Sequence, residues 1–485
     1  MQNRKIVLSV AAVTAVGAAL RFATLGRQSF WLDELVTVSL VRRGFSDMLG
    51  AIPGSEATPY VYYILAWVWT RVFGFGEAGL RSLSAVVGTA TIPVAYAAGT
   101  AFVSRRIGLI AAALVAVNPF LVWYSQEARA YALFAFFAAL SVLFFARALG
   151  DDRRSLAGWA VASSLAIATH YFAVFLVVPA AALLIVRVPR RSFAVLTSLA
   201  PAAVLAAHLP LLLRQRHHGE TLRQSALGSR IAGIPKDLVV GYSFPAGLAG
   251  SIVAAVLVVV GVVLFVTRTP VAARRRASIA GALAAVSLLV PLGLAAVGAD
   301  YVIARNMIAA IVPAAVLLAA GYAASRLGLI AAAALCALSL AIAVAVGADT
   351  RYGRTDWRGA AEQLRHPAVE RAIVVTPYLS RTLWRPYLRG LREPRMDSVR
   401  VSEIVVIALA TQGGFTSGPL HPPRTPPRPP PPGFRLVEVK RDPTLTLVRY
   451  RSQGASSPVS TAELAGLELV DVQAIVLLQD RDGHR

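Results

Sequence analysis

The sequence contains few of the residues that build a soluble or a disulfide-bonded protein. Cysteine occurs once, at Cys336, so the chain cannot form an internal disulfide, and redox chemistry is not indicated. Only 15% of the 485 residues are charged, 56% are hydrophobic, and the mean hydropathy is +0.63. Water-soluble globular proteins do not have this composition. We therefore expect a polytopic membrane protein.

Acidic residues are also scarce, since 25 Asp and Glu face 48 Lys and Arg, which gives a formal net charge of +23. Such an excess can serve nucleic-acid binding, but here the arginines lie between apolar segments rather than on one soluble face. This distribution is typical of the positive-inside pattern of membrane proteins. The charge is therefore interpreted as a determinant of topology and of attraction to membrane lipids, and no nucleic-acid partner is expected.

The apolar segments have the length that a bilayer requires. A hydrocarbon core of about 30 Å needs a helix of about 17–25 residues, and about eleven stretches meet that condition. The first, residues 6–25, follows Asn3-Arg4-Lys5 and has no small-residue cleavage site before Arg27, so it is expected to be retained with its N-terminus in the cytoplasm. The others are expected near residues 83–103, 107–124, 131–149, 156–170, 172–187, 193–213, 247–267, 278–298, 302–320 and 328–348.

The first external loop is expected to carry interfacial helices. Residues 60–73 are short for a span and rich in Tyr and Trp, which favours a helix lying flat on the membrane, although a crossing remains the alternative. With a flat helix, alternation of the spans places the arginines at 105–106, 147–154, 187–191 and 268–276 in the cytoplasm. The external loop 214–245 is basic against the rule, so either the count slips there or its charges meet an anionic ligand.

After Val346 the composition changes to that of a small α/β domain. A helix is expected over residues 353–365, followed by strands at 372–376, 403–409, 436–440 and 444–450. A Pro-rich loop at 422–432 interrupts it and is expected to be extended and mobile. The predicted fold is therefore an all-α polytopic membrane domain, residues 1–348, followed by an extracytoplasmic α/β domain, residues 349–485. The predicted location is the plasma membrane.

Two groups of polar residues lie at the predicted outer ends of spans. Asp33 and Glu34 follow Phe30-Trp31-Leu32, where they are either functional carboxylates or the first-turn acids that cap a helix. The second group is Tyr124-Ser125-Gln126-Glu127-Ala128-Arg129-Ala130-Tyr131. Tyrosines beside an arginine at headgroup depth suit a lipid phosphate, because a guanidinium binds two phosphate oxygens at once. The alternative is a Glu127–Arg129 pair that caps two helices.

Taken in order, these motifs resemble the N-terminal half of GT-C membrane glycosyltransferases, close to the protein O-mannosyltransferase and lipid A aminoarabinose transferase group. The resemblance rests on Trp31-Leu32-Asp33-Glu34, Thr58-Pro59-Tyr60-Val61-Tyr62-Tyr63, Leu80-Arg81-Ser82-Leu83-Ser84 and the segment 124–131. It covers about residues 1–180 well, and residues 301–313 and Asp356-Trp357-Arg358 more loosely.

The resemblance implies a site and an activity. A polyprenyl-phosphate-linked sugar would be the donor, and a lipid, glycan or protein outside the cytoplasm the acceptor. Asp33, with Glu34 beside it, would act as the base or position the acceptor, and Arg129 and Arg305, together with Tyr124, would bind the donor phosphate. Relatives have His-Pro-Pro where this chain has Ala57-Thr58-Pro59, which weakens the case for the metal that some of them bind there. No cofactor is certain, and a divalent metal stays an open alternative.

The chemistry needs a base near the acceptor and positive charge on the departing phosphate. One carboxylate suffices for an inverting displacement, whereas a covalent intermediate needs a second carboxylate, for which Glu127 is the candidate. Inversion is therefore favoured. The alternative function is a transporter or flippase of polyprenyl-linked sugars, but the internal repeats and mid-membrane charges typical of transporters are not found. A non-catalytic membrane scaffold is the third class considered.

Overall fold

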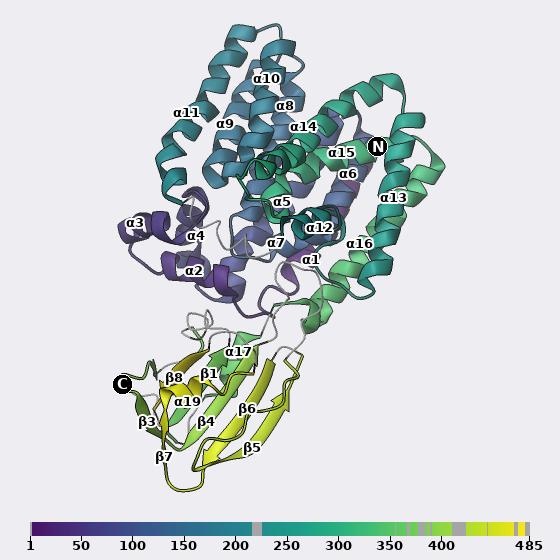
Figure 1. Ribbon diagram of the computed structural model, residues 1–485. Helices are drawn as coiled ribbons and strands as arrows, with labels where there is room; N and C mark the ends of the chain where they lie inside the picture. Colours follow the sequence, from purple (N-terminus) through teal and green to yellow (C-terminus); the bar gives the residue numbers. More distant parts are fainter. Residues whose placement is uncertain are drawn as a thin grey trace. The chain divides into compact units, whose positions relative to one another are not determined.

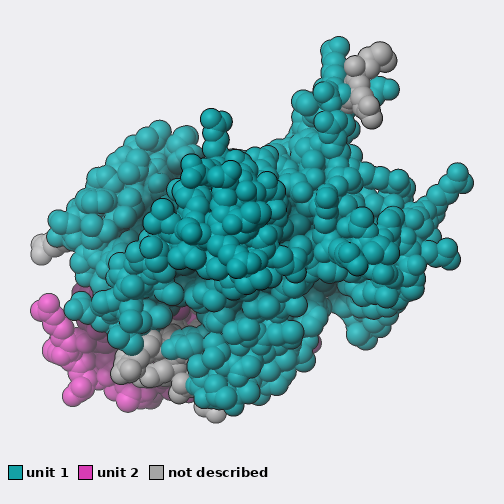
Figure 2. Space-filling view, turned by 90° about the horizontal axis from the view of Figure 1, so that it is seen from above, with its two compact units in different colours: residues 1–26, 36–345 teal, residues 27–35, 346–485 magenta. Residues whose placement is uncertain are grey.

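The computed structural model describes residues 2–215, 226–354, 356–365, 369–376, 384, 386–388, 390–409, 423–443, 445–469 and 474–480. Figure 1 shows the elements along the chain, and Figure 2 colours its two units. The helical unit comprises residues 1–26 and 36–345, and the sheet unit comprises residues 27–35 and 346–485. The functions predicted for 1–348 and 349–485 remain predictions.

The first unit consists of helices (Figure 1). In chain order they are α1 (Gln2–Phe22), α2 (Leu32–Val41), α3 (Phe45–Ser55), α4 (Val61–Phe73), α5 (Glu77–Phe102), α6 (Arg105–Val117), α7 (Pro119–Ser125), α8 (Tyr131–Ala148), α9 (Arg153–Thr169), η1 (Tyr171–Ala173), α10 (Val174–Arg187), α11 (Arg191–Gln215), α12 (Leu227–Val240), α13 (Gly247–Thr267), α14 (Val271–Ala296), η3 (Ala304–Ala310), α15 (Ile311–Tyr322) and α16 (Arg326–Ala348). The helices α2 and α16 continue into the sheet unit.

The helical membrane region predicted from the sequence is confirmed, but with fewer full-length spans. Within the described residues, eight helices are long and apolar enough to cross a bilayer, and the bent pair α6 and α7 raises the number to nine. Two of the eleven predicted spans, at residues 156–170 and 172–187, are not among these helices. They form α9, with 17 residues, and α10, with 14 residues behind the 3₁₀ turn η1. Both are shorter than the 18 residues of the shortest full-length span, α8.

The core of this unit is made of small and aliphatic side chains. Helix α8 packs against α5 and α9, and most of its residues are buried. Helices α5 and α6 approach closely at two glycines, where a Cβ on Gly99 would lie 2.8 Å from the Cα of Gly108. Small residues at such crossings let membrane helices pack backbone to backbone.

The segment expected to lie flat on the membrane is the thirteen-residue helix α4. At 1.5 Å per residue it is roughly 20 Å long, shorter than a bilayer core of about 30 Å. It ends where Gly74 adopts a positive φ of 82° and its N–H bonds to the carbonyl of Thr70. The orientation of α4 to the membrane remains a prediction.

The second unit contains a mixed six-stranded sheet in the order β2-β8-β1-β4-β6-β5 and a two-stranded sheet β3-β7 (Figure 1). Strands β1 and β4 pair in parallel at its centre, and the other pairs are antiparallel. The elements are η4 (Thr350–Tyr352), α17 (Trp357–Glu362), β1 (Arg371–Thr376), β2 (Leu391–Arg392), β3 (Ser398–Val401), β4 (Glu403–Leu409), β5 (Phe434–Arg441), β6 (Leu445–Ser452), β7 (Ser457–Ser460), α19 (Thr461–Ala465) and β8 (Ile475–Gln479). The predicted C-terminal domain with a sheet is thereby confirmed.

The Pro-rich loop has no helix or strand over residues 423–431, whereas Pro422 lies outside the described residues. Two side chains of β6 hold it: the Thr446 hydroxyl donates to the carbonyl of Pro423 at 2.8 Å, and the Tyr450 hydroxyl donates to the carbonyl of Arg428 at 2.7 Å. The loop is therefore extended along the sheet, as its composition predicted.

The short segment 27–35 folds with the sheet unit rather than with the helices that flank it in sequence. The Arg354 N–H donates to the Gln28 side chain at 3.1 Å, the Trp357 N–H donates to Ser29 Oγ at 2.9 Å, and the Phe30 N–H donates to the Tyr387 hydroxyl at 2.8 Å. These contacts join residues more than 320 positions apart. Such pairing is not visible in a local sequence pattern.

Candidate donor-phosphate site

The segment predicted to bind phosphate follows a sharp bend between α6 and α7. The two helices meet at 59°, and Asn118 caps the second by accepting the Leu121 N–H at 2.9 Å, with Pro119 at its first position. Asparagine followed by proline is a strong signal for a helix start. The bend thus follows from the local sequence. The polar segment 124–131 begins at the end of the short helix α7 that follows the bend.

A buried arginine of the first helix holds this bend in place. Arg21 donates to the carbonyls of Val115 and Ala116, at 3.2 and 2.8 Å, and to Ser125 Oγ at 3.1 Å. The two carbonyls lie in the last turn of α6, where the helix dipole favours a positive charge. Gln126 adds a second tie, because its amide donates to the carbonyl of Leu20 at 2.7 Å. The turn that follows is therefore fixed against α1.

Arg129 lies in this turn and is buried, with 6% of its surface exposed. Both terminal nitrogens of its guanidinium donate to the two carboxylate oxygens of Glu56, each at 2.7 Å. Glu56 is itself 2% exposed. The sequence suggested a local Glu127–Arg129 pair as the alternative to phosphate binding, whereas the structure gives Arg129 a bidentate ion pair with a residue 73 positions earlier. At Glu127 the N–H of Arg129 bonds to the backbone carbonyl, at 2.8 Å.

Glu56 is the C-terminal cap residue of α3 and has further neighbours. The Tyr63 hydroxyl hydrogen-bonds to its carboxylate and lies 2.9 Å from the Thr58 hydroxyl. Burial raises the pKa of Tyr63 well above its ordinary value, so the phenol stays protonated. The segment of Glu56 is thus tied to α4 and to the turn of Arg129.

Arg305 comes from a different part of the chain, the 3₁₀ helix η3. The loop before η3 is anchored by Arg230 of α12, whose guanidinium pairs with Asp300 and donates to the carbonyl of Val302 at 2.7 Å. Arg230 belongs to the basic loop 214–245, of which residues 216–225 lie outside the described part. At least this charge of the loop therefore meets a carboxylate of the same chain. Arg305 is partly exposed, in contrast to Arg129.

Tyr131 is the residue around which the candidate side chains meet. The Arg305 guanidinium lies 5.5 Å from the centre of its ring, Tyr124 packs edge-on at 4.9 Å, and His170 lies 5.8 Å away. Arg129 and Arg305 both act electrostatically on His170, and Glu127 and Arg305 act on Tyr124. The structure therefore brings together four of the six predicted site residues. We refer to Tyr124, Glu127, Arg129, Tyr131, His170 and Arg305 as the arginine–aromatic cluster.

His170 is a neutral member of this cluster. Its ring stacks on Phe134 at 4.7 Å with 8° between the planes, and Nδ1 accepts the Phe172 N–H at 3.2 Å. Burial, with the charges of Arg305 and Arg129, lowers the pKa of His170 to about 3. Its Nε2 is therefore the protonated nitrogen of a neutral imidazole, and the ring adds no charge to the two arginines.

Tyr242 is a neighbour that the sequence did not single out. Its hydroxyl lies 2.5 Å from that of Tyr124. It follows Gly241, whose φ of +82° ends α12 and turns the chain. A Gly-Tyr pair at the end of a basic helix was available as a signal, but nothing local connects it to residue 124.

Asp33 and Glu34, the predicted catalytic pair, lie in the sheet unit, in the first turn of α2. Glu34 is buried, and its carboxylate accepts the N–H of Trp31 at 3.2 Å. This is half of a capping box, which was the structural alternative for the pair. Asp33 is partly exposed. Glu34 thus has a demonstrable role in starting α2, and the role of Asp33 remains a prediction.

Among the described residues, no group of three or more His, Cys, Asp and Glu side chains could hold a metal ion. Glu56 is the acid nearest to the segment where relatives place a histidine, but its two oxygens contact Arg129. The described residues around Glu56 therefore give no support to a metal site there.

Glu56 is the residue that sequence reasoning missed. Its signal was a lone carboxylate directly before Ala57-Thr58-Pro59, in an otherwise apolar segment. An acid in such a segment requires a buried partner. The partner lies in the turn of Arg129, which no sequence spacing indicates.

Part of the chain matches a known protein family. Residues 57–213 match the family described as dolichyl-phosphate-mannose-protein mannosyltransferase. This segment contains Tyr124, Glu127, Arg129 and His170, whereas Asp33, Glu34 and Arg305 lie outside it. No curated protein matches the chain.

Several solved structures are similar. ArnT from Cupriavidus metallidurans bound to undecaprenyl phosphate has 16% identity and a TM-score of 0.47, covering 67% of this chain and 61% of its own. An oligosaccharyltransferase from Archaeoglobus fulgidus in complex with Zn and sulfate has 12% identity and a TM-score of 0.42, covering 74% of this chain and 55% of its own. The protein O-mannosyltransferase Pmt1-Pmt2 complex of S. cerevisiae has 17% identity and a TM-score of 0.32, covering 43% of this chain and 34% of its own. This chain thus spans about three fifths of the length of ArnT.

Proposed function

We propose that this chain, which over residues 57–213 matches the family described as dolichyl-phosphate-mannose-protein mannosyltransferase, is a membrane glycosyltransferase that transfers a sugar from a polyprenyl-phosphate donor. The acceptor is a hydroxyl group outside the cytoplasm, on a lipid, a glycan or a protein. The observation that carries the proposal is the arginine–aromatic cluster, in which two guanidiniums and two tyrosines from four elements meet beside a neutral histidine.

The reaction explains why such a cluster is useful. The acceptor oxygen attacks the anomeric carbon, the bond from that carbon to the phosphate oxygen breaks, and the acceptor proton passes to a base. The phosphate begins as a diester with one negative charge and leaves as a monoester with a larger charge. Fixed cations at a partly desolvated position stabilise the charge that develops on departure. These cations are arginine side chains of the protein itself, and the reaction needs no nucleotide-binding fold.

Arg305 is the better candidate for direct contact with the phosphate. It is partly exposed, and its guanidinium lies 5.5 Å from the centre of the Tyr131 ring. Arg129 has both terminal nitrogens on Glu56, so a phosphate would have to replace that carboxylate. We therefore assign Arg305 to the phosphate and keep Arg129 as a second phosphate ligand only if Glu56 moves. Tyr124, with its hydroxyl against Tyr242, shapes the same surface.

The proposed base is Asp33, with Glu34 stabilising the start of α2 that carries it. A single base supports an inverting displacement. Glu127 is the candidate second carboxylate of a retaining mechanism, and it is 1% exposed. A nucleophile must reach the anomeric carbon, and a buried carboxylate is poorly placed for that. Inversion is therefore the mechanism we propose.

A transfer assay tests this function directly. Membranes containing the chain are incubated with radiolabelled polyprenyl-phosphate sugars, mannose first, and both labelled acceptor and free polyprenyl phosphate are measured. The expected result is transfer with the wild type and with Arg326→Ala, an exposed arginine at the start of α16, but not with Arg305→Ala. Absence of transfer from every donor, with donor moved intact across sealed vesicles, would instead identify a flippase.

A further inference from the structure

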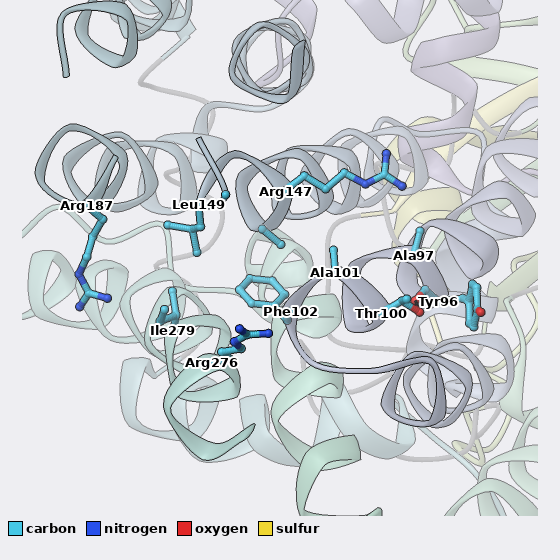
Figure 3. Close-up of a pocket in the computed structure, with 12 residues that line it drawn as sticks. Tyr96, Ala97, Thr100, Ala101, Phe102, Arg147, Leu149, Arg187, Arg276 and Ile279 are labelled. Atoms are coloured by element: carbon cyan, nitrogen blue, oxygen red, sulfur yellow. Dashed lines mark hydrogen bonds between the residues drawn. The ribbon is translucent and has the colours of Figure 1, made fainter. Parts of the chain in front are cut away.

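A second basic site lies in the helical unit, away from the arginine–aromatic cluster. Figure 3 shows a cavity of about 680 Å³ between the C-terminal ends of α5, α8 and α10 and the N-terminal part of α14. Three arginines line it, Arg147 of α8, Arg187 of α10 and Arg276 of α14. In the view of Figure 3, Arg147 and Arg187 lie at opposite sides, and Arg276 and Phe102 lie between them.

These three arginines carry charge that the described part of the chain does not neutralise. All three are exposed, and none has an ion pair or a side-chain hydrogen bond within the described residues. The two acids that follow α8 are engaged elsewhere. Asp151 pairs with Arg190 at 3.1 Å, and Asp152 caps α9 by accepting the Ser155 N–H at 3.0 Å. Three cations therefore border one cavity without a counterion among the residues that the structure describes.

Helix dipoles account for only two of them. Arg147 and Arg187 lie in the last turns of their helices, where a positive charge is favourable. Arg276 is the sixth residue of α14, beyond the first turn and far from the C-terminal end, so the dipole of α14 gives no favourable interaction with a cation there. Its position beside the other two is therefore not explained by helix stability, but an anionic ligand would explain it.

The rest of the lining suits a lipid better than a free anion. Phe102, Leu149 and Ile279, with three alanines, supply an apolar wall, and the hydroxyls of Tyr96 and Thr100 lie on its α5 side. A cavity of this volume is within the range of about 300–1,000 Å³ that holds drug-sized molecules, and it exceeds what one phosphate needs. Basic pockets between membrane helices characteristically bind acidic lipid headgroups.

The cavity is distinct from the candidate transfer site. Arg147 and Tyr131 lie near opposite ends of α8, sixteen residues and therefore roughly 24 Å apart along the helix. The sequence predicts that the arginine end faces the cytoplasm. A ligand bound there would occupy the opposite membrane surface from the proposed donor.

We propose that this cavity binds the phosphate headgroup of an acidic phospholipid, with Arg147, Arg187 and Arg276 around the phosphate and the apolar wall against the glycerol and upper acyl chains. The ligand class follows from uncompensated positive charge beside an apolar wall at the end of helices long enough to cross a bilayer. The inference does not depend on sugar transfer, because it concerns the other end of α8.

Lipid binding to the purified full-length protein in detergent tests the proposal. Native mass spectrometry compares phosphatidylglycerol with phosphatidylcholine for the wild type, for Arg147→Gln/Arg187→Gln/Arg276→Gln, and for the matched control Arg154→Gln/Arg191→Gln/Arg275→Gln. The control removes the same charge from three exposed arginines that do not line the cavity. Equal unfolding temperatures of the two triple variants establish that both are folded.

The expected result is that the wild type and the control prefer phosphatidylglycerol, and that the cavity variant loses roughly tenfold to a hundredfold of its phosphatidylglycerol affinity. Equal loss in both triple variants would show unspecific attraction and overturn the proposal. Displacement of bound phosphatidylglycerol by millimolar inorganic phosphate would also overturn it, because the site would then be one for a soluble anion.

Discussion

Arg129 and Glu56 form a bidentate ion pair with both contacts at 2.7 Å, and both residues are almost fully buried. The pair joins the turn after α7 to the end of α3, and it uses the planar geometry that only a guanidinium offers to a carboxylate. A buried pair of this kind fixes a geometry more reliably than it adds stability. Its main consequence is that the position of Glu56 and the charge available from Arg129 depend on each other.

We expect Glu56→Gln and Arg129→Gln each to destabilise the protein strongly. Each leaves one buried partner uncompensated, which costs about 3–5 kcal/mol for pairs of this kind. The double variant should be less destabilised than the sum of the two, because removal of both charges leaves neither unpaired. Thermal unfolding in detergent measures this, and additive losses would contradict a shared role.

The same variants separate the two roles considered for Arg129. If Arg129 acts by holding Glu56, then Glu56→Gln and Arg129→Lys should change donor affinity to a similar extent. A tenfold loss of polyprenyl-phosphate-sugar affinity in Arg129→Lys, with no change in Glu56→Gln at matched stability, would make Arg129 a direct phosphate ligand.

Arg305→Ala should weaken donor binding with less loss of stability than a substitution of Arg129, because Arg305 is partly exposed whereas Arg129 is buried. A charge-assisted contact to phosphate is worth about 1.5–3 kcal/mol, which corresponds to roughly ten- to a hundredfold in affinity. Isothermal titration with a polyprenyl-phosphate sugar measures it, and Arg326→Ala is the control. Unchanged affinity in Arg305→Ala would remove Arg305 from the site.

Local sequence patterns predicted the elements but not their long-range partners. The β1, β4, β5 and β6 strands follow from runs of β-branched side chains. The strands β2, β3 and β7 have two to four residues and carry no such pattern. Strand β8 lies in the C-terminal tail, where the sequence analysis predicted no strand. The continuous span predicted over residues 107–124 was wrong, because the chain bends by 59° at Asn118-Pro119, a helix-start signal that the sequence contains.

The candidate site shows the same difference between residues that are close in sequence and partners that are distant in sequence. Tyr124, Glu127 and Arg129 are adjacent in sequence and could be found together, and the family resemblance added Arg305. Glu56 and Tyr242 lie 73 and 118 residues from their partners, so only the folded chain reveals them. The attachment of residues 27–35 to the sheet unit was missed for the same reason.

His170 should make the stability of the helical unit sensitive to acid. Its pKa in the folded protein is about 3, below the 6.5 of an exposed histidine, so the unfolded chain binds the proton more strongly. The stabilisation is complete above pH 6.5 and is lost progressively as the pH falls from 6.5 toward 3. His170→Phe should therefore flatten the decline in unfolding temperature between pH 6.5 and 4.

The matched variant is His208→Phe, at a partly exposed histidine in α11. An unchanged slope in His170→Phe would show that other groups cause the decline.

The membrane topology can be tested by labelling single cysteines in a Cys336→Ser background. Arg275→Cys and Arg105→Cys are exposed positions that the sequence places in the cytoplasm, and Ala299→Cys is an exposed position that it places outside. In intact cells an impermeant maleimide should label only position 299. Labelling of position 105 from outside would mean that α4 crosses the membrane.

Substitutions of Asp33 and Glu34 distinguish a catalytic base from a helix cap at the start of α2. Glu34 accepts the N–H of Trp31 at 3.2 Å and is buried, whereas Asp33 is partly exposed one residue earlier. We expect Glu34→Gln to lower the unfolding temperature, because loss of a helix cap costs about 0.5–2 kcal/mol, with a modest effect on turnover. Asp33→Asn should abolish transfer at unchanged stability, because it is isosteric and removes only the proton acceptor. Transfer rates and unfolding temperatures of the two variants, measured side by side with the donor that the wild type uses, decide between the roles. Wild-type turnover by Asp33→Asn would exclude Asp33 as the base, and a reversed pattern, with turnover lost only in Glu34→Gln at full stability, would assign the base to Glu34.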